Sequence, residues 1–205
     1  MDLYYSPLAC SMASRIVAYE AGGDLGFTRV DTRAGKLADG TDYRTINPMG
    51  QVPALKTDDG QIVTENAVVL QVLADAWPDA GLAPAAGTPE RYRLQQWLSF
   101  TGTELHKAVF SVLLTPKAPA EAKTYARGLL DERLDTLETH LTGRDWVLDH
   151  FSVADAYLAA VLNWTRFTAV DLKPWPAVAA YFARLGARPS VARAAQEELQ
   201  LFQAA

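Results

Sequence analysis

Pro53 limits what the first half of this chain can fold into more than any other residue. It stands between a turn-rich segment, residues 46–52, and the short apolar run Ala54-Leu55, which is typical of a strand. Because proline has no N–H to donate to a β-ladder, it is confined to the first residue or the edge of a strand. If the Val52–Pro53 bond is cis, the N–H and C=O of Val52 face outward and can pair with an extended peptide. The sequence therefore predicts an edge that binds a short peptide by its backbone.

A second motif lies where the strand-like residues 61–64 meet the apolar, helix-like residues 67–73. Glu65 and Asn66 should open that helix, where unpaired N–H groups and the positive end of the helix dipole favour a bound carboxylate. The carboxylate of Glu65 can accept a hydrogen bond from an ammonium group. Together the two residues can hold both ends of an α-amino acid head group, and the γ-glutamyl end of glutathione is such a group.

Either motif alone has a simpler interpretation. Pro53 can merely begin a strand, and Thr64 or Asn66 can merely cap a helix. At this spacing the two motifs together resemble the glutathione-binding half of cytosolic glutathione transferases, in which the matching pieces are a Gln-Val-Pro loop and a Glu-Ser or Asp-Ser turn. The resemblance implies a glutathione site.

The overall composition limits the classes of partner. The chain has 205 residues, of which 49% are hydrophobic, so it can bury a substantial core as one large or two small domains. Its net charge of -5 and pI near 5.2 argue against nucleic acids and acidic membranes, because those bind clustered Lys and Arg. Small molecules and proteins remain as partners, and we expect no metal site.

The sequence also bears on the compartment. No run of about eighteen uncharged apolar residues is present, and residues 1–5 lack a basic segment that leads into an apolar one. Cys10 is the single cysteine, which excludes an internal disulfide and agrees with a reducing compartment. We therefore expect a cytoplasmic protein.

The first 78 residues predict an α/β domain of thioredoxin-like layout. Its expected order is strand, helix, strand, followed by a hairpin and a helix. The hairpin is indicated by Asp58-Asp59-Gly60 between apolar runs, because Asp-Gly is a strong turn signal. The other expected elements are strands at 3–5 and 27–30, a helix at 10–21, a loop at 32–42, a short helical turn at 43–47 and a helix at 65–76.

Residues 79–87 are rich in Ala, Gly and Pro and are followed only by helical patterns, so they are predicted to link two domains. We expect a thioredoxin-like domain at 1–78 and an all-helical bundle domain at 88–205. Ser152 and Asp155 form a capping-box motif, so Asp155 is interpreted as a cap rather than as an acid catalyst. The helices expected after the linker are 88–114, 119–142, 153–169, 175–186 and 189–202.

Cys10 follows the strand-ending Ser6-Pro7 and should begin the first helix, where unpaired N–H groups favour a thiolate over a thiol. A reactive cysteine is therefore expected, although a buried and inert cysteine is the usual fate of this residue type. The motif Cys10-Ser11-Met12-Ala13 has no second cysteine, which argues against dithiol oxidoreductase activity. A mixed disulfide with glutathione remains open.

His106 lies at the margin of the apolar stripe of the long helix predicted at 88–114. A histidine at such a margin is compatible with a surface position and with a functional position in a cleft between the domains. The residues alone leave both interpretations open.

Several motifs together resemble bacterial beta-class glutathione transferases over nearly the whole chain. They are Tyr4-Tyr5-Ser6-Pro7, Cys10-Ser11, Asn47-Pro48, Gly50-Gln51-Val52-Pro53, Glu65, Arg91, Trp97-Leu98, Glu104-Leu105-His106-Lys107 and Val153-Ala154-Asp155-Ala156-Tyr157. The resemblance implies a homodimeric enzyme that uses glutathione as co-substrate. It also implies that Cys10 and His106 flank the glutathione sulfur.

The same resemblance assigns the remaining site residues. Glutathione is expected to bind Tyr5, Lys36, Gln51, Val52, Pro53, Glu65, Asn66, Ser99 and the Glu104 of a partner subunit. A pocket for a small hydrophobic electrophile is expected between the domains, lined by Tyr5, Leu8, Phe110, Leu114, Trp164 and Phe167, although aromatic residues at this spacing also fit a plain core.

Three positions depart from the family pattern. Asn66 replaces a usual serine with an amide that can do similar work, Ser99 replaces a common asparagine, and Lys36 stands alone where two adjacent lysines are frequent. The changes at Ser99 and Lys36 predict weaker glutathione binding, by about 1 kcal/mol for each compromised hydrogen bond.

Conjugation requires the glutathione thiolate, yet a thiol with a pKa of about 8.5 is mostly protonated at neutral pH. Lowering that pKa by about two units takes about 2.7 kcal/mol, and the helix start at Cys10, Ser11 and His106 are the candidate donors. Tyr5 is a rival activator. Cys10 either donates its S–H to the sulfur or attacks a disulfide, which would add thiol-transfer or peroxidase activity. The alternative functions are a noncatalytic binding protein and a glutathione-dependent isomerase or dehalogenase.

Overall fold

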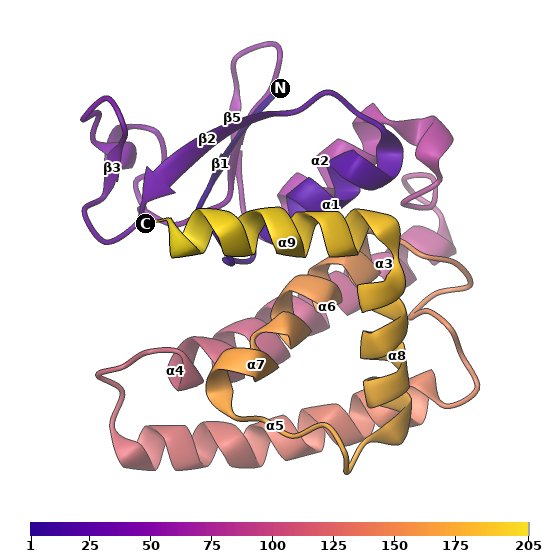
Figure 1. Ribbon diagram of the computed structural model, residues 1–205. Coiled ribbons are helices and arrows are strands. Elements are labelled where there is room, and N and C mark those ends of the chain that lie inside the picture. Colours follow the sequence, from indigo (N-terminus) through magenta and orange to yellow (C-terminus); the bar gives the residue numbers. More distant parts are fainter. Residues whose placement is uncertain (205) are drawn as a thin grey trace. The chain divides into compact units, whose positions relative to one another are not determined.

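The computed structural model describes residues 1–204, which form two compact units (Figure 1). The first unit comprises Met1–Ala83 and the C-terminal segment from Pro189, and the second comprises Pro84–Arg188. The boundary between Ala83 and Pro84 falls within the expected linker, residues 79–87. No helix among residues 1–204 is both long and apolar enough to cross a membrane.

The first unit is built on a mixed sheet of five strands in the order β3-β2-β1-β4-β5. The central strand β1 is parallel to β2 and antiparallel to β4, and Leu3 of β1 is in register with Phe27 and Leu55 on either side. Because successive side chains point to opposite faces, Tyr4 packs on the face that carries Tyr43. The strands are β1 Asp2–Tyr5, β2 Gly26–Asp31, β3 Lys36–Leu37, β4 Ala54–Lys56 and β5 Ile62–Thr64.

Two details of this sheet bear on the predictions. The antiparallel pair β4 and β5 confirms the hairpin expected around Gly60, whose φ of 83° suits glycine. The segment 32–42, expected to be a loop, contains the two-residue strand β3, which pairs with the end of β2. The prediction was wrong here because a strand of two residues is too short to show the alternation that indicates a strand.

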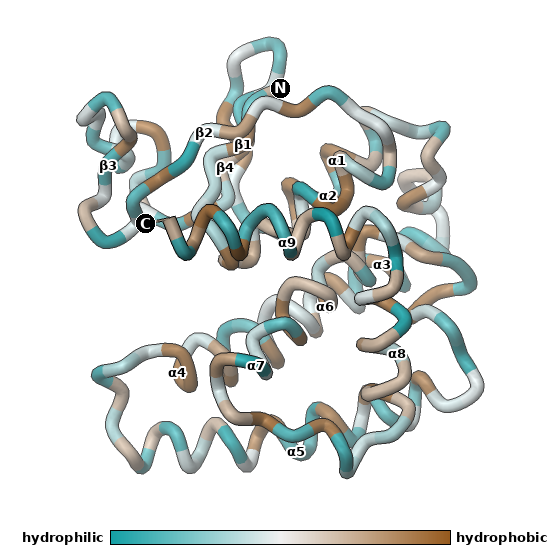
Figure 2. Tube along the Cα trace, in the orientation of Figure 1, coloured by the Kyte–Doolittle hydropathy of each residue, from teal (hydrophilic) through white to brown (hydrophobic). Residues whose placement is uncertain are grey.

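The first unit contains helices α1 Met12–Ala21, α2 Asn66–Ala76 and α9 Pro189–Gln203, with short 3-10 turns at Tyr43–Thr45 and Pro78–Ala80. Helix α1 contacts both α2 and α9. Figure 2 shows that α9 carries hydrophilic and hydrophobic segments in alternation. The expected second domain, 88–205, therefore has to end before Pro189, because α9 packs on α1 and groups with the first unit.

The second unit is all-helical. Its central helix is α6, in which every residue is buried and which contacts α3, the π-helical segment η3 and α8. The helix expected at 88–114 is one continuous run, but its middle ten residues form the π-helix η3. The helix expected at 153–169 is interrupted at Trp164. The segments are α3 Pro89–Phe100, η3 Thr101–Phe110, α4 Ser111–Leu113, α5 Ala120–Leu141, α6 Val153–Asn163, α7 Thr165–Thr168 and α8 Pro176–Ala187.

The capping box at the start of α6 is formed as expected. The buried carboxylate of Asp155 accepts hydrogen bonds from the Ser152 N–H at 2.9 Å, the Val147 N–H at 3.1 Å and the Tyr181 hydroxyl at 2.7 Å. Burial raises the pKa of Asp155 above its ordinary value. All its contacts are structural, so Asp155 organises the second unit. The two units thus confirm the predicted fold class, a thioredoxin-like α/β domain followed by an all-helical domain.

Candidate functional site

Cys10 lies at the end of the turn that joins β1 to α1. The turn is closed by a backbone hydrogen bond from the Ala9 N–H to the Ser6 carbonyl at 3.1 Å, and Leu8 within it has a left-handed φ of 59°. The Cys10 side chain is buried, with 6% of its surface exposed. Its Sγ lies 3.4 Å from the carbonyl oxygen of Val52 and donates to it. The structure therefore brings the thiol directly against the segment predicted to bind a peptide.

The start of α1 offers fewer unpaired N–H groups than the sequence suggested. The N–H of Met12 donates to the Ala9 carbonyl at 3.0 Å, and that of Ala13 donates to the Cys10 carbonyl at 3.1 Å. Helix α1 begins only at Met12, so Cys10 precedes the helix by two residues. The free N–H groups at the start of α1 therefore stabilise a Cys10 thiolate less than the sequence predicted.

The hydroxyl of Ser11 is already committed as a donor. Its side chain is fully buried, and its hydroxyl donates to the Ser6 carbonyl at 3.2 Å while accepting from the Ser6 N–H at 3.4 Å. A hydroxyl has only one hydrogen to donate. The hydroxyl proton of Ser11 therefore stabilises the turn between β1 and α1 and is not free for the glutathione sulfur.

The segment before β4 presents the backbone of Val52. The Val52–Pro53 bond is cis, and Pro53 is buried immediately before the first residue of β4. The Gln51 carbonyl accepts hydrogen bonds from the Tyr43 hydroxyl at 3.0 Å and the Asn47 amide at 2.6 Å. These two bonds hold the segment before β4 in place. Among residues 1–204 the Val52 N–H has no partner.

The carbonyl of Val52 differs from the expectation in one respect, since it already accepts from Cys10. A carbonyl oxygen has two lone pairs, so it can accept a second hydrogen bond. The unpaired N–H and this second lone pair together still form the donor and acceptor that an extended peptide requires.

Glu65 and Asn66 open α2 as predicted. Glu65 has a left-handed φ of 67°, which is uncommon for a residue with a side chain, and its exposed carboxylate makes no hydrogen bond or ion pair with any of residues 1–204. The Asn66 side chain is 6% exposed, and neither its amide nitrogen nor its amide oxygen has a hydrogen-bond partner. Buried polar groups are rarely left unpaired, so this amide indicates a site for a polar ligand.

Two further predicted glutathione contacts lie in the same unit. Lys36 is an exposed residue of β3, and its ammonium group has no partner among residues 1–204. Tyr5 is 5% exposed and packs edge-on against Phe27, with the guanidinium of Arg15 4.7 Å from the centre of its ring. Tyr5 is therefore mainly a core residue of the first unit.

His106 lies in the π-helix of the second unit, and its side chain is 9% exposed. Its Nδ1 lies 2.8 Å from the hydroxyl of Tyr157 on α6, and its ring packs edge-on against Trp164 at 4.8 Å. Burial, with a smaller effect from the positive charge of Lys107, lowers the pKa of His106 to about 4. The imidazole is therefore neutral at pH 7, with one ring nitrogen that donates and one that accepts.

Tyr157 is the residue that the sequence reasoning missed. It belongs to a motif of the family resemblance but was given no role there. A signal was available, because a tyrosine on a largely apolar helix needs a partner for its hydroxyl. The π-helix also favours a functional position, since such turns are frequent at functional sites.

The residues predicted for an electrophile pocket do not share one environment. Phe110 and Trp164 are buried and pack against each other at 5.9 Å, so together with His106 they form an aromatic cluster in the second unit. Leu114 and Phe167 are 36% and 49% exposed. A cavity of about 680 Å³ in this unit contains none of them and is lined instead by residues that include Trp97, Phe100, His140 and Val147.

Ser99 and Glu104 also lie in the second unit. Ser99 is exposed on α3, and its carbonyl accepts from the Thr103 hydroxyl at 3.0 Å. The carboxylate of Glu104 accepts from Nε and Nη2 of Arg133 at 3.0 and 2.9 Å. This ion pair is partly exposed and therefore of modest strength, so it does not exclude a ligand contact. Within residues 1–204 no group of three His, Cys, Asp or Glu side chains is placed to hold a metal ion.

Comparison with known proteins identifies relatives of the whole chain. Residues 9–76 match the family model described as the N-terminal domain of glutathione S-transferase, and residues 100–189 match the model of its C-terminal domain. The chain is 39% identical to the glutathione S-transferase GstA of Escherichia coli O157:H7 over 97% of its own length and 98% of that protein.

Solved structures agree with these matches. A sphingomonad glutathione S-transferase complexed with glutathione superposes with a TM-score of 0.91 at 42% identity, covering 97% of this chain and 98% of the other. A bacterial beta-class glutathione S-transferase from Sphingomonas chungbukensis has the same TM-score of 0.91 and identity of 42%, again over 97% and 98% of the two chains.

Proposed function

The chain belongs to the glutathione S-transferase family, and from this premise we propose that its first unit binds glutathione and that the enzyme joins the glutathione sulfur to small hydrophobic electrophiles. The observation that carries the proposal is the buried, unpaired amide of Asn66 beside the unpaired carboxylate of Glu65 at the start of α2.

The γ-glutamyl head group has a carboxylate and an ammonium group for these positions. The carboxylate accepts from the Asn66 amide and from the first N–H groups of α2, and the ammonium group donates to Glu65. The cysteinyl backbone of the peptide then pairs with the N–H and C=O of Val52. Lys36 meets the glycyl carboxylate at the other end. Further proposed contacts are Tyr5, Gln51, Pro53, Ser99 and the Glu104 of a partner subunit.

Activation of the glutathione sulfur requires donors that favour its thiolate. We assign these to Cys10 and to His106. In the free protein the single S–H of Cys10 donates to the Val52 carbonyl, so it would have to turn from that oxygen to the glutathione sulfur. A neutral histidine with its pKa near 4 is a weak base at pH 7, so His106 acts as a hydrogen-bond donor to the sulfur rather than by taking its proton. Donation from Tyr157 to Nδ1 would leave the hydrogen on Nε2, which is then the donor.

The electrophile is proposed to meet the aromatic residues of the second unit, with Phe110 and Trp164 as its buried wall and Leu114 and Phe167 as exposed contacts, alongside Leu8. A homodimer in the cytoplasm, acting in detoxification, completes the proposal. Matches to glutathione S-transferases over 97% of the chain favour an enzyme over a noncatalytic binding protein.

Glutathione binding measured by isothermal titration calorimetry tests the proposal. Asn66→Ala should raise the dissociation constant for glutathione about tenfold or more, since hydrogen bonds to a charged group are worth about 1.5–3 kcal/mol. Asn66→Ser keeps a polar group and should retain most of the affinity. Glu65→Gln should also weaken binding, whereas Glu90→Gln removes an exposed carboxylate at the start of α3 and serves as the control. Unchanged affinity in folded Asn66→Ala would contradict the proposed head-group site.

A further inference from the structure

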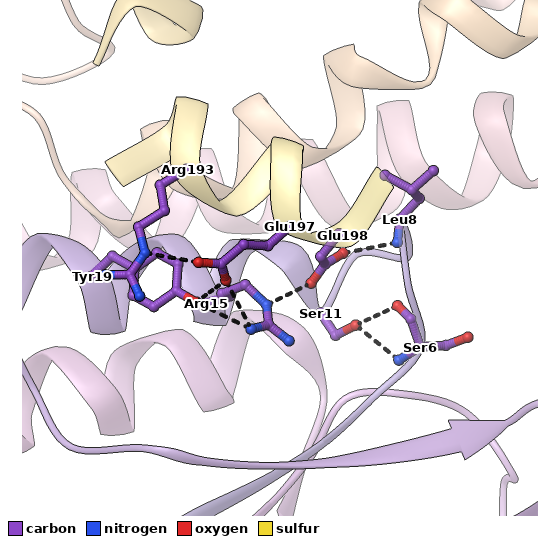
Figure 3. A network of polar contacts seen from close by, with 8 residues as sticks. All are labelled: Ser6, Leu8, Ser11, Arg15, Tyr19, Arg193, Glu197 and Glu198. Carbon is purple, nitrogen blue, oxygen red and sulfur yellow. Dashed lines mark hydrogen bonds and ion pairs between the residues drawn. The ribbon is translucent and has the colours of Figure 1, made fainter. Parts of the chain in front are cut away.

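Glu198 of α9 is a fully buried carboxylate whose contacts reach the turn that carries Cys10. Its Oε2 accepts a hydrogen bond from the Leu8 N–H at 2.8 Å, and its Oε1 accepts from Nε of Arg15 at 3.1 Å (Figure 3). Leu8 and Glu198 are 190 positions apart in the chain. The C-terminal helix therefore contacts the backbone of the turn only two residues before Cys10.

The backbone of this turn needs such an anchor. The φ of Leu8 is 59°, in the left-handed region where a residue with a Cβ is strained. Such conformations persist only where the surroundings hold them in place. The hydrogen bond from the Leu8 N–H to Glu198 acts on the strained residue itself.

Arg15 holds the carboxylate in place from α1. Its guanidinium lies 3.9 Å from the centre of the Phe27 ring, and its Nη1 donates to the Tyr19 hydroxyl at 3.1 Å. Glu197, the neighbour of Glu198, lies 3.5 Å from the same Nη1 and also accepts from Arg193 and Tyr19. Figure 3 shows Glu197 among Arg193, Tyr19 and Arg15, whereas the carboxylate of Glu198 reaches the Leu8 N–H.

We propose that Glu198 is a positioning residue for Cys10, which acts by holding Leu8 in its left-handed conformation and so keeps the thiol against the Val52 carbonyl. This inference rests on the proposed role of Cys10 in catalysis. Release of Leu8 lets the turn relax to an ordinary backbone conformation, and Sγ then loses its fixed distance of 3.4 Å to Val52. A thiol that is 6% exposed becomes accessible to solvent, while the geometry for glutathione is lost.

Alkylation of the thiol by iodoacetamide tests this inference without glutathione, so its outcome is separate from that of the proposed transferase function. Cys10 is the single cysteine, so the rate reports one site. Glu198→Leu should accelerate alkylation about tenfold, the effect of losing one buried hydrogen bond. Glu198→Gln retains an acceptor oxygen for Leu8 and should restore a rate within about threefold of the wild type.

Glu197→Leu is the matched control, since it removes a carboxylate from the same network without touching Leu8, and it should alkylate at the wild-type rate. Urea unfolding of the same samples separates positioning from stability. The inference is overturned if folded Glu198→Leu reacts at the wild-type rate, or if the rates of all variants simply follow their loss of stability.

Hydrogen exchange keeps the test decisive if Glu198→Leu does not fold. At pH 8, where Glu198 is ionised, the Leu8 amide should exchange faster in Glu198→Gln than in Glu197→Gln, because a neutral acceptor forms a weaker hydrogen bond. Equal exchange in these two variants would show that Glu198 does not anchor the turn.

Discussion

The hydroxyl of Tyr157 lies 2.8 Å from Nδ1 of His106, and this hydrogen bond joins α6 to the π-helix within the second unit. The imidazole of His106 is neutral at pH 7 and so carries one N–H. The hydrogen-bond partner of one ring nitrogen decides which of the two nitrogens carries that hydrogen. The pair therefore explains how a histidine that is a poor base at pH 7 can serve as an oriented donor.

Removing the hydroxyl in Tyr157→Phe should lower kcat for conjugation of chlorodinitrobenzene about tenfold, as expected for one buried hydrogen bond that orients a donor. The KM for glutathione should change little, because Tyr157 is not proposed to touch the peptide. Nitrogen-15 chemical shifts of His106 should show the loss of a single tautomer. Tyr92→Phe, at an exposed position on α3, is the control. An unchanged kcat in Tyr157→Phe would show that Tyr157 does not orient His106.

His106 should also make stability depend on pH. Its pKa is lowered from 6.5 to about 4 in the folded state, so the folded protein binds fewer protons between these values than the unfolded chain. The stability it contributes is present above pH 6.5 and is lost as pH falls towards 4. Relative to His106→Asn, the wild type should lose about 2 kcal/mol in free energy of unfolding between pH 7 and pH 5. Parallel curves for the two proteins in urea titrations would contradict this.

Glu198 should make stability depend on pH in the opposite direction to His106 over the same pH range. Burial raises its pKa from 4.5 to about 7, against the opposing effects of Arg15 and the Leu8 N–H. The folded state then binds the extra proton, so the contribution to stability is fully present below pH 4.5 and is lost as pH rises through 7. The free energy of unfolding of the wild type relative to Glu198→Gln should therefore fall by about 2 kcal/mol from pH 5 to pH 7. A difference that grows with pH would show that Glu198 is ionised throughout.

Cys10→Ala should abolish disulfide exchange with glutathione and leave part of the conjugation activity, because exchange needs the thiolate of Cys10 as nucleophile whereas conjugation keeps the donor His106. Ser11→Ala is the informative neighbour. It should cost about 1 kcal/mol of stability through loss of its bond to Ser6, while each folded molecule keeps both activities. Equal loss of exchange and conjugation in Cys10→Ala would show that the thiol is misassigned.

The parts of the fold that the sequence predicted correctly are those with local physical causes. The turn at Gly60, the start of α2 at Asn66 and the capping box at Ser152 each depend on residues within a few positions of one another. The parts that it missed depend on distant partners. Helix α9 shows an apolar stripe, but nothing in that stripe says that Glu198 will meet Arg15 of α1.

The same distinction applies to the site. Glu65, Asn66 and Val52 were predicted from backbone requirements, and the structure leaves polar groups unpaired at all three. Ser11 was assigned a role from its place at the start of the first helix and from the family motif Cys10-Ser11, and the structure shows its hydroxyl committed to Ser6. The environment of a polar group decides whether it is available, and that environment is formed by tertiary contacts.

A crystal structure of the protein soaked with glutathione tests the central claim most directly. The account predicts the γ-glutamyl carboxylate within hydrogen-bond distance of the Asn66 amide, the ammonium group on Glu65, and the cysteinyl backbone paired with Val52 so that the sulfur approaches Cys10. A tripeptide bound with its head group away from α2, or with its sulfur far from Cys10, would contradict the account.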